Sequence, residues 1–253
     1  MNTIMDTYDV VVLDIEGTTT PITFVHDCLF PYVLENIEEF LEKNWGTDEL
    51  KHYIRLLREQ AEKDVEEKME NALPIPLETD TNSAQVKRAV IDCIRWQMSI
   101  DRKIGALKSF QGYMWKSAYN SGSLKGVIYN DVVPALEKWR EQGKKIYIYS
   151  SGSVPAQKLL FGYSDKGDLL HYFSGHYDTS IGLKVERESY EKIAKDIGIN
   201  PTRILFVSDN IHEIVAANEA GFQTAISDRP GNAPLTEEAR QKHRVVTSFL
   251  QLF

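Results

Sequence analysis

Polar side chains that could do chemistry follow three apolar runs in this sequence. The pairs are Tyr8–Leu13 with Asp14, Lys145–Tyr149 with Ser150, and Ile204–Val207 with Asp209 two residues later. A nearly continuous apolar run is typical of a strand buried on both faces, as in a parallel sheet. Ligands of such sheets bind at the carboxyl ends of the strands. We therefore expect these three polar residues at one site.

Asp14 and Glu16 form the first candidate pair. Two carboxylates at i and i+2 across an irregular turn can face one site. One could attack phosphorus and form an aspartyl-phosphate, while the other protonates the leaving oxygen and later activates water. The alternative is an Asp14 that only ends the strand before the turn at Gly17. This motif alone does not separate the two.

Asp209 is a candidate metal ligand. Mg²⁺ prefers oxygen ligands and takes few carboxylates from a protein, so Asp14 and Asp209 would suffice. Alternatively, Asp209 or Asn210 caps the helix that follows. Glu213 lies one helical turn later, and we interpret it as a solvated residue or an acceptor behind the site rather than a direct ligand.

A serine-rich turn and one lysine are candidates for phosphate binding. The turn Ser150–Ser153 joins a predicted strand to a predicted helix, where N–H groups and hydroxyls suit a phosphate, although a capping turn needs only one serine. Lys184 precedes the helix beginning near Glu186 and could pair with phosphate and with Asp14. Most loop lysines, however, are only solvated.

The surrounding elements predict an α/β core with an all-helical insert. Strands and helices alternate in 1–22 and 123–253, which predicts a parallel sheet with right-handed crossovers. Residues 23–122 show helical periods and no convincing strand, which predicts an all-helical insert. Further expected strands are His176–Asp178, Phe222–Ile226 and Val245–Val246, and the core helices are Val132–Glu141, Val154–Phe161 (capped by Ser153), Glu186–Ile197 and Ile211–Ala220.

The composition limits the function classes. The chain has 253 residues, 42% hydrophobic content and a net charge of −8, which favour a folded protein and argue against a general nucleic-acid binder. Cys28 and Cys93 lie in apolar segments, and we expect buried free thiols. Met1–Asp6 shows no signal peptide, and no segment is apolar for long enough to span a membrane. We expect an intracellular protein.

The order Asp14–Thr18, Ser150, Lys184, Asp209 resembles the four motifs of haloacid dehalogenase-like phosphatases. This resemblance implies that 1–22 and 123–253 form a Rossmann-like catalytic core and that the insert 23–122 is a helical cap. A closer resemblance is to the enolase-phosphatase (acireductone synthase) family of methionine salvage. The stretches that carry it are Asp14–Ile22 with Phe24, Leu29–Tyr32, Tyr147–Ser153, Gln157–Gly162 and Arg229–Ala233. Glu16 stands where the superfamily usually has Asp, as in that family.

This resemblance implies a two-step reaction. The family enolises 2,3-diketo-5-methylthiopentyl-1-phosphate and then hydrolyses the ester to the acireductone 1,2-dihydroxy-3-keto-5-methylthiopentene and phosphate. It implies one Mg²⁺ per chain at Asp14, Glu16 and Asp209. Asp14, Glu16 and Lys184 would be catalytic, and Ser150, Ser151 and Lys184 would bind substrate. The resemblance also implies a cytoplasmic monomer, a nuclear location being left open, with a small-molecule partner and neither nucleic acid nor membrane.

Other functions remain open at this stage. A capped phosphatase of another small phosphate monoester would use the same four motifs. A receiver-type signalling domain also phosphorylates an Asp on a parallel sheet, although it needs no helical cap, and a phosphatase relic could serve as a scaffold.

For the apolar tail of the substrate, Phe24 is our pocket candidate, whereas we assign most of Trp96, Met98, Phe110, Met114 and Trp115 to the cap core.

Overall fold

The computed structural model describes residues 8–253, and these form two compact units. One unit is an α/β structure made of the described residues up to Cys28 together with Tyr119–Phe253, and the other is Leu29–Ala118, which is all helical. The expectation that no signal peptide is present rests on Met1–Asp6, which lie outside the described residues. The two units are described separately below.

The α/β unit is built on a parallel sheet. Within residues 8–253 the sheet has six strands in the order β3-β2-β1-β4-β5-β6, and every pairing is parallel. The strands are β1 (Val10–Leu13), β2 (Lys145–Tyr149), β3 (Gly175–Tyr177), β4 (Ile204–Ser208), β5 (Gln223–Ser227) and β6 (Val245–Val246). The predicted Rossmann-like parallel sheet is confirmed.

The strand β1 lies between β2 and β4, and its register brings the candidate residues to one edge. Leu13 pairs with Ile148 on one side and with Val207 on the other. All four residues of β1 are buried, as their continuous apolar sequence requires of a central strand. The chain therefore leaves β1, β2 and β4 at the same edge of the sheet.

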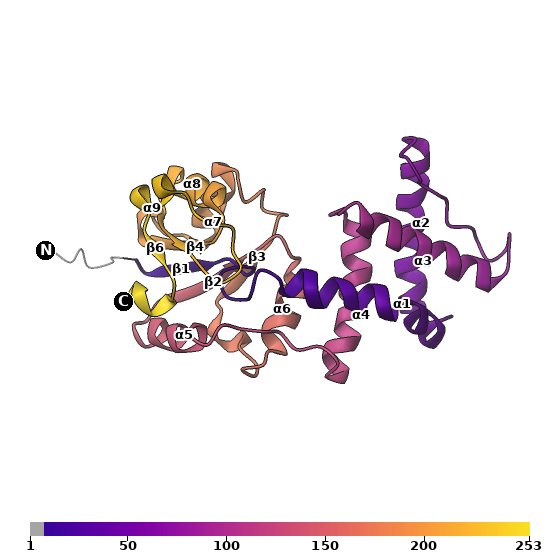
Figure 1. Cartoon of the computed structure of the whole chain (residues 1–253), viewed down its shortest axis with the longest axis horizontal. Coiled ribbons are helices and arrows are strands. Elements are labelled where there is room, and N and C mark those ends of the chain that lie inside the picture. Colours follow the sequence, from indigo (N-terminus) through magenta and orange to yellow (C-terminus); the bar gives the residue numbers. More distant parts are fainter. Residues whose placement is uncertain (1–7) are drawn as a thin grey trace, which may run out of the picture. The chain divides into compact units, whose positions relative to one another are not determined.

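Helices cover both faces of this sheet (Figure 1). Helix α8 packs on β4 and β5, whereas α5 packs on β2. One face buries side chains of α7 and α8 against the sheet, including Tyr190, Ile193 and Ile214. The helices of this unit are α5 (Val132–Glu141), α6 (Val154–Gly162), α7 (Arg187–Ile197), α8 (Ile211–Glu219) and α9 (Glu237–Lys242), with single turns η2 (Leu170–Tyr172), η3 (Pro201–Arg203) and η4 (Phe249–Leu252).

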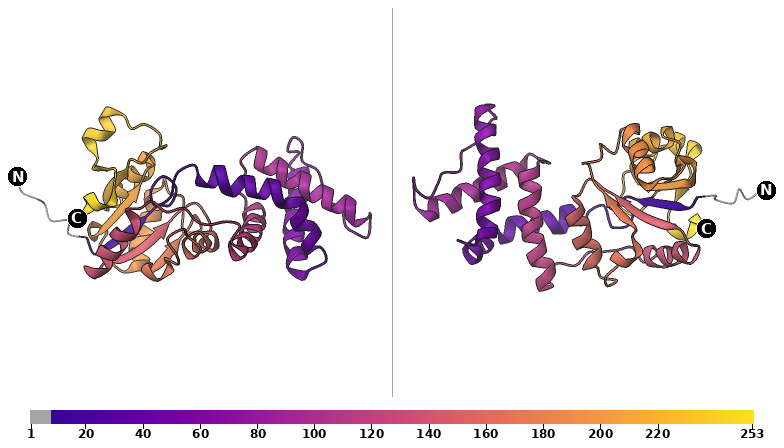
Figure 2. Two further views of the ribbon diagram at one scale, coloured as in Figure 1. Left: turned by 60° about the horizontal axis from the view of Figure 1, so that its bottom comes forward. Right: turned by 180° about the vertical axis from the view of Figure 1, so that it is seen from behind.

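The helical unit has its own apolar core. Its helices are α1 (Phe30–Asn44), α2 (Asp48–Glu66), α3 (Ser83–Ser99) and most of α4 (Gly105–Ser121), and Figure 2 shows them from two further directions. Thr47 and Asn82 cap α2 and α3 by accepting hydrogen bonds from backbone N–H groups. Phe110 and Met114 are fully buried, which agrees with the assignment of the cap aromatic and Met side chains to the core.

Several boundaries differ from the expected ones, and each difference has a local cause. The charged sequence after Asp48 predicts a helix that ends near Asn71, but α2 ends at Glu66, because Lys68 and Asn71 adopt positive φ angles of 56° and 63°. The helical unit is Leu29–Ala118 rather than 23–122. The ring of Tyr119 lies 5.9 Å from that of Tyr163, so this end of α4 packs within the α/β unit.

Three smaller expectations are wrong or incomplete. Ser153 occupies the first position before α6, but its side chain makes no cap, and the carboxylate of Asp178 accepts the N–H of Val154 instead. Cys28 is exposed, whereas Cys93 is buried as expected. Helix α9 was not predicted. No helix among residues 8–253 combines the length and apolar character needed to cross a membrane.

Candidate active site

Asp14 lies directly after the central strand, in a backbone loop held by its own hydrogen bonds. The N–H of Asp14 still donates to the carbonyl of Val207 at 3.0 Å. The N–H groups of Thr18–Thr20 then converge on the carbonyl of Ile15 at 2.9–3.2 Å, and Gly17 turns the chain with a φ of +66°. The three threonines are fully buried. The loop therefore presents Asp14 from a fixed backbone.

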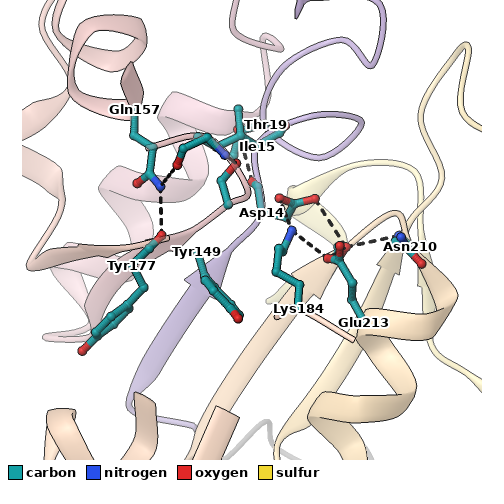
Figure 3. Close-up of polar contacts among 12 residues, drawn as sticks. Asp14, Ile15, Thr19, Tyr149, Gln157, Tyr177, Lys184, Asn210 and Glu213 are labelled. Carbon is teal, nitrogen blue, oxygen red and sulfur yellow. Dashed lines mark hydrogen bonds and ion pairs between the residues drawn. The ribbon is translucent and has the colours of Figure 1, made fainter. Parts of the chain in front are cut away.

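Lys184 links Asp14 to Glu213. Its Nζ donates to Asp14 Oδ1 at 2.5 Å and lies 2.7 Å from Glu213 Oε2, so the lysine sits between two carboxylates (Figure 3). The hydroxyl of Tyr190 donates to the Lys184 carbonyl at 2.6 Å, which ties the loop to α7. Ser208 donates to Glu213 Oε2 at 2.7 Å. The predicted Lys184–Asp14 pair is thus present in the structure.

Negative charge exceeds positive charge at this site. Burial and the charge of Asp14 raise the pKa of Glu213 to about 7 against the opposing effect of Lys184. Burial and the charge of Asp14 likewise raise the pKa of Asp209 to about 6. Burial alone would lower the pKa of Lys184, but the carboxylates of Asp14 and Glu213 outweigh it and raise this pKa. One lysine therefore faces several carboxyl groups and remains protonated.

The oxygen atoms around Gly17 fit a hard divalent cation. A Cβ added at Gly17 would lie 2.6 Å from Asp209 Oδ2 and 2.7 Å from Asn232 Oδ1, so both oxygens approach the loop that follows Asp14. Carboxylate and amide oxygens are ligands that Mg²⁺ accepts. Within residues 8–253, no three His, Cys, Asp or Glu side chains form a metal-binding group. The structure therefore does not gather Asp14, Glu16 and Asp209 as three side-chain ligands.

The serine turn after β2 is fixed by hydrogen bonds to neighbouring backbone. The amide of Gln157 donates to the carbonyls of Gly152 and Tyr177, both at 2.8 Å (Figure 3). Ser150 is buried, and its Oγ accepts the N–H of Gly152 at 3.3 Å. Its hydroxyl is therefore engaged within the turn. Ser151, the next residue, is exposed.

A cavity of about 480 Å³ opens over these residues, within the α/β unit. Asp14, Glu16, Ser151, Lys184 and Asp209 line it, so five of the six predicted site residues meet there. Ser150 is not among the lining residues. The remaining lining residues are Ile22, Asn210, Ile211, His212, Glu213, Ala233, Pro234, Leu235, Thr236 and Ala239.

Two interpretations of individual residues change. Phe24 is buried and does not line this cavity, where Ile22 contributes an apolar side chain instead. Glu213 is buried and ion-paired, so its interpretation as a solvated residue is wrong. It accepts hydrogen bonds from Lys184 and Ser208, as expected of an acceptor, but it lines the cavity rather than lying behind it. Asn210 is the helix cap, because its side chain accepts the N–H of His212.

The turn Arg229–Asn232 contains residues that the sequence did not assign to the site. Arg229 is buried, pairs with Asp131 at 2.9 Å and donates to the carbonyl of Thr18 at 3.3 Å. Asn232 donates to the carbonyl of Gly17 at 2.9 Å. The local sequence predicts only a turn here. The one signal that could have indicated a role is that Arg229–Ala233 is among the stretches that resemble the enolase-phosphatase family.

Known proteins resemble the chain over nearly its whole length. A family model described as haloacid dehalogenase-like hydrolase matches residues 8–221. Enolase-phosphatase E1 of Danio rerio is 52% identical over 244 residues, covering 96% of this chain and 94% of that protein. Enolase-phosphatase E1 of Xenopus tropicalis is 53% identical over 244 residues, covering 96% and 93%. The solved structure of the UTR4 protein from Saccharomyces cerevisiae has a TM-score of 0.75 and 32% identity, covering 95% and 98%.

Proposed function

Because the chain belongs to the enolase-phosphatase E1 family of haloacid dehalogenase-like hydrolases, we propose that it produces an acireductone in methionine salvage. The proposed substrate is 2,3-diketo-5-methylthiopentyl-1-phosphate, and the products are 1,2-dihydroxy-3-keto-5-methylthiopentene and phosphate. The observation that carries this proposal is the Asp14–Lys184–Glu213 cluster beside Asp209, at the bottom of a cavity that Glu16 also lines. The proposed setting is a monomer in the cytoplasm.

In the hydrolytic step, Asp14 is the nucleophile. One of its oxygens, Oδ1, is held by Lys184, and we assign the attack on phosphorus to Oδ2, which lies 3.4 Å from the hydroxyl of Ser208. The P–O bond to the substrate breaks, and an aspartyl-phosphate forms. Glu16 protonates the departing enediol oxygen, then takes a proton from the water that hydrolyses the aspartyl-phosphate. The products are inorganic phosphate and the regenerated Asp14.

Lys184 and the serine turn hold the phosphate. The ammonium group of Lys184 is fixed between Asp14 and Glu213, so its positive charge is available at the phosphorus without a large movement. Ser151 lines the cavity and can donate to a phosphate oxygen. Ser150 holds the turn in shape, because its Oγ accepts the N–H of Gly152. Phosphoryl transfer depends mainly on such positioning and charge neutralisation.

The enolisation step needs a proton carrier, and we assign it to Glu16. A proton leaves the carbon that bears the phosphate ester, and a proton is delivered to the neighbouring carbonyl oxygen. Glu has one more methylene than the Asp usual at this position and reaches further from the loop. Glu16→Asp should therefore reduce enol formation more than hydrolysis of a simple phosphate ester. Equal losses in the two assays would contradict this role.

The carboxylates of Asp14 and Asp209 would hold Mg²⁺, with Glu16 contributing beside them. Their fit is supported by the surplus negative charge and by the oxygen atoms that meet at Gly17. When bound, Mg²⁺ supplies positive charge that neutralises the phosphate and polarises a carbonyl group. We propose one ion per chain.

The proposed function is tested by following two products in one reaction. Absorbance of the enediol and release of phosphate should rise together from the diketo phosphate ester, and both should require Mg²⁺. Sugar phosphates serve as the comparison substrates. Faster phosphate release from a sugar phosphate than from the diketo ester would identify a phosphatase of another monoester. Phosphate release without an enediol signal would remove the enolisation step from the proposal.

A further inference from the structure

The side-chain amide of Asn232 has a fixed orientation. Its Nδ2 donates to the carbonyl of Gly17 at 2.9 Å and to that of Ser227 at 3.0 Å. An amide oxygen in that position would face two carbonyl oxygens and no donor, so the nitrogen must point there. The Oδ1 atom consequently points in the opposite direction.

Oδ1 of Asn232 is buried and accepts no hydrogen bond from any residue in the range 8–253. It approaches the same point beside Gly17 as Oδ2 of Asp209, at 2.7 Å and 2.6 Å from a Cβ built there. Two acceptor oxygens therefore converge on the loop that follows Asp14. The next residue along the chain, Ala233, lines the cavity.

A buried acceptor without a donor is unfavourable, and a second acceptor beside it makes the arrangement worse. A cation removes both costs, because a bound cation polarises its waters into strong donors and attracts carboxylate and amide oxygens alike. Partners just outside the ligands of a metal typically orient those ligands. Asn232 combines these features, because its Nδ2 holds the loop at Gly17 and its Oδ1 approaches the same point as Oδ2 of Asp209.

We propose that Asn232 is a positioning residue of the cation site, with Oδ1 accepting a hydrogen bond from a water bound to the cation. This inference rests on the metal dependence stated in the proposed function. It also gives the turn Arg229–Asn232 a role beyond changing the direction of the chain. Position 17 must be a glycine in this arrangement, because a side chain there would collide with the side-chain oxygens of Asp209 and Asn232.

Arg229 offers a matched control on the same turn. It donates to the carbonyl of Thr18, the neighbour of Gly17, and pairs with Asp131. Its guanidinium lies 4.6 Å from the ring centre of Tyr129 and 4.8 Å from that of Phe249. These contacts hold the same loop from the side of the C-terminal segment. Arg229 does not line the cavity, so Arg229→Lys perturbs the support of the loop without changing the oxygens near Asp209.

The test is a calorimetric titration of Mg²⁺ into the metal-free full-length protein, with no substrate present. Asn232→Ala should raise the Kd for Mg²⁺ about tenfold, and Asn232→Ser, with a side chain too short to reach the same point, should act in the same direction. Arg229→Lys should lower the Tm of the metal-free protein and leave the Kd unchanged. Far-UV circular dichroism establishes that each variant is folded, and Asn232→Ser serves if Asn232→Ala is not.

The outcomes separate this inference from the proposed function. If the unaltered protein does not bind Mg²⁺, the metal dependence in the proposed function is wrong. If it binds Mg²⁺ and both Asn232 variants bind equally well, only the role of Asn232 is wrong. An equal loss of affinity in the Asn232 variants and in Arg229→Lys would assign the effect to the position of the loop, and would also overturn the proposal.

Discussion

Two buried acidic groups, one in each unit, differ in how their charge is compensated. In the helical unit, the side chain of Asp64 is fully buried on α2. It pairs with Arg102 and accepts the amide of Gln60 at 2.8 Å. One carboxylate thus meets one guanidinium, and the remaining acceptor capacity is filled by a neutral amide. This is a closed arrangement without charge left over.

The cluster around Asp14 is different. Lys184 is shared between Asp14 and Glu213, and Asp209 stands nearby without an ion pair to any residue in the described range 8–253, with its pKa raised to about 6 by burial and by Asp14. A cavity opens onto this group. Charge that is not balanced within the protein marks a place where a ligand supplies the balance. Asp64 and Asp14 are both buried, so burial does not distinguish the two sites. The difference is that the charge of Asp64 is balanced by one guanidinium, whereas the carboxylates around Asp14 outnumber their single lysine.

Replacement of Asp14, the proposed nucleophile, should give the largest effect. Asp14→Asn is expected to lower the rate of phosphate release at least about 10⁴-fold, because the amide cannot form the aspartyl-phosphate. The fold should persist, since Lys184 keeps Glu213 as its partner. Phosphate release and the urea midpoint are measured on the same preparation. Substantial remaining activity would show that Asp14 is not the nucleophile.

The matching change in the helical unit should affect stability and not chemistry. Asp64→Asn leaves Arg102 buried without its partner, which should lower the free energy of unfolding by about 3 kcal/mol. The comparison variant is Asp92→Asn, which breaks an exposed pair with Arg88 on α3 and should change stability by less than about 0.5 kcal/mol. Urea unfolding measures both. Similar effects of the two variants would contradict the assignment of Asp64 as a buried structural pair.

Glu213 tests the second carboxylate beside Lys184. Glu213→Gln removes one of the two charges that raise the pKa of Lys184 and leaves Asp14 alone to oppose the lowering effect of burial. We expect kcat to fall by about tenfold at pH 7, and the loss should grow with increasing pH as Lys184 deprotonates. Phosphate release between pH 6 and 9 gives the profile. Glu219→Gln, at an exposed position of α8, should leave the profile unchanged.

The smallest predicted effect concerns a histidine behind the serine turn. Nδ1 of His176 bonds Oε1 of Gln157 at 3.1 Å, and burial together with Lys158 lowers the pKa of His176 to about 4. The unfolded chain, with an ordinary His pKa near 6.5, therefore binds more protons between pH 6.5 and 4. Stability should fall as the pH falls through this window, and His176→Gln should lose less stability between pH 7 and pH 5.

Urea midpoints at the two pH values test this prediction. His52→Gln, at an exposed position of the helical unit, is the control and should follow the unaltered protein. Equal losses for the unaltered protein and His176→Gln would show that His176 does not contribute.

Much of the α/β unit followed from local sequence. A continuous apolar run predicts a buried parallel strand, and parallel neighbours in register bring the residues after β1, β2 and β4 together. Asp14 and Asp209 were therefore predictable from strand ends alone. Lys184 was not, because nothing in its surroundings distinguishes it from a solvated loop lysine, and only the order of motifs indicated it.

The remaining site features depend on contacts between distant segments. The cap of α6 comes from Asp178 rather than from the adjacent Ser153. The burial of Glu213 depends on Lys184, which belongs to another loop. Asn232 reaches Gly17 across most of the sequence. Local periodicity carries no information on such contacts, since they arise only when the sheet has formed.

The central position of β1 determines when, during synthesis of the chain, the active site can form. Val10 is synthesised before both of its strand partners, Lys145 and Ile204. The strand that carries Asp14 must wait unpaired while the helical unit, whose contacts are local, is synthesised. Hydrolytic capacity therefore arises only after Ile204 has been synthesised, and nascent fragments that end before Ile204 contain Asp14 without β4 and without Asp209.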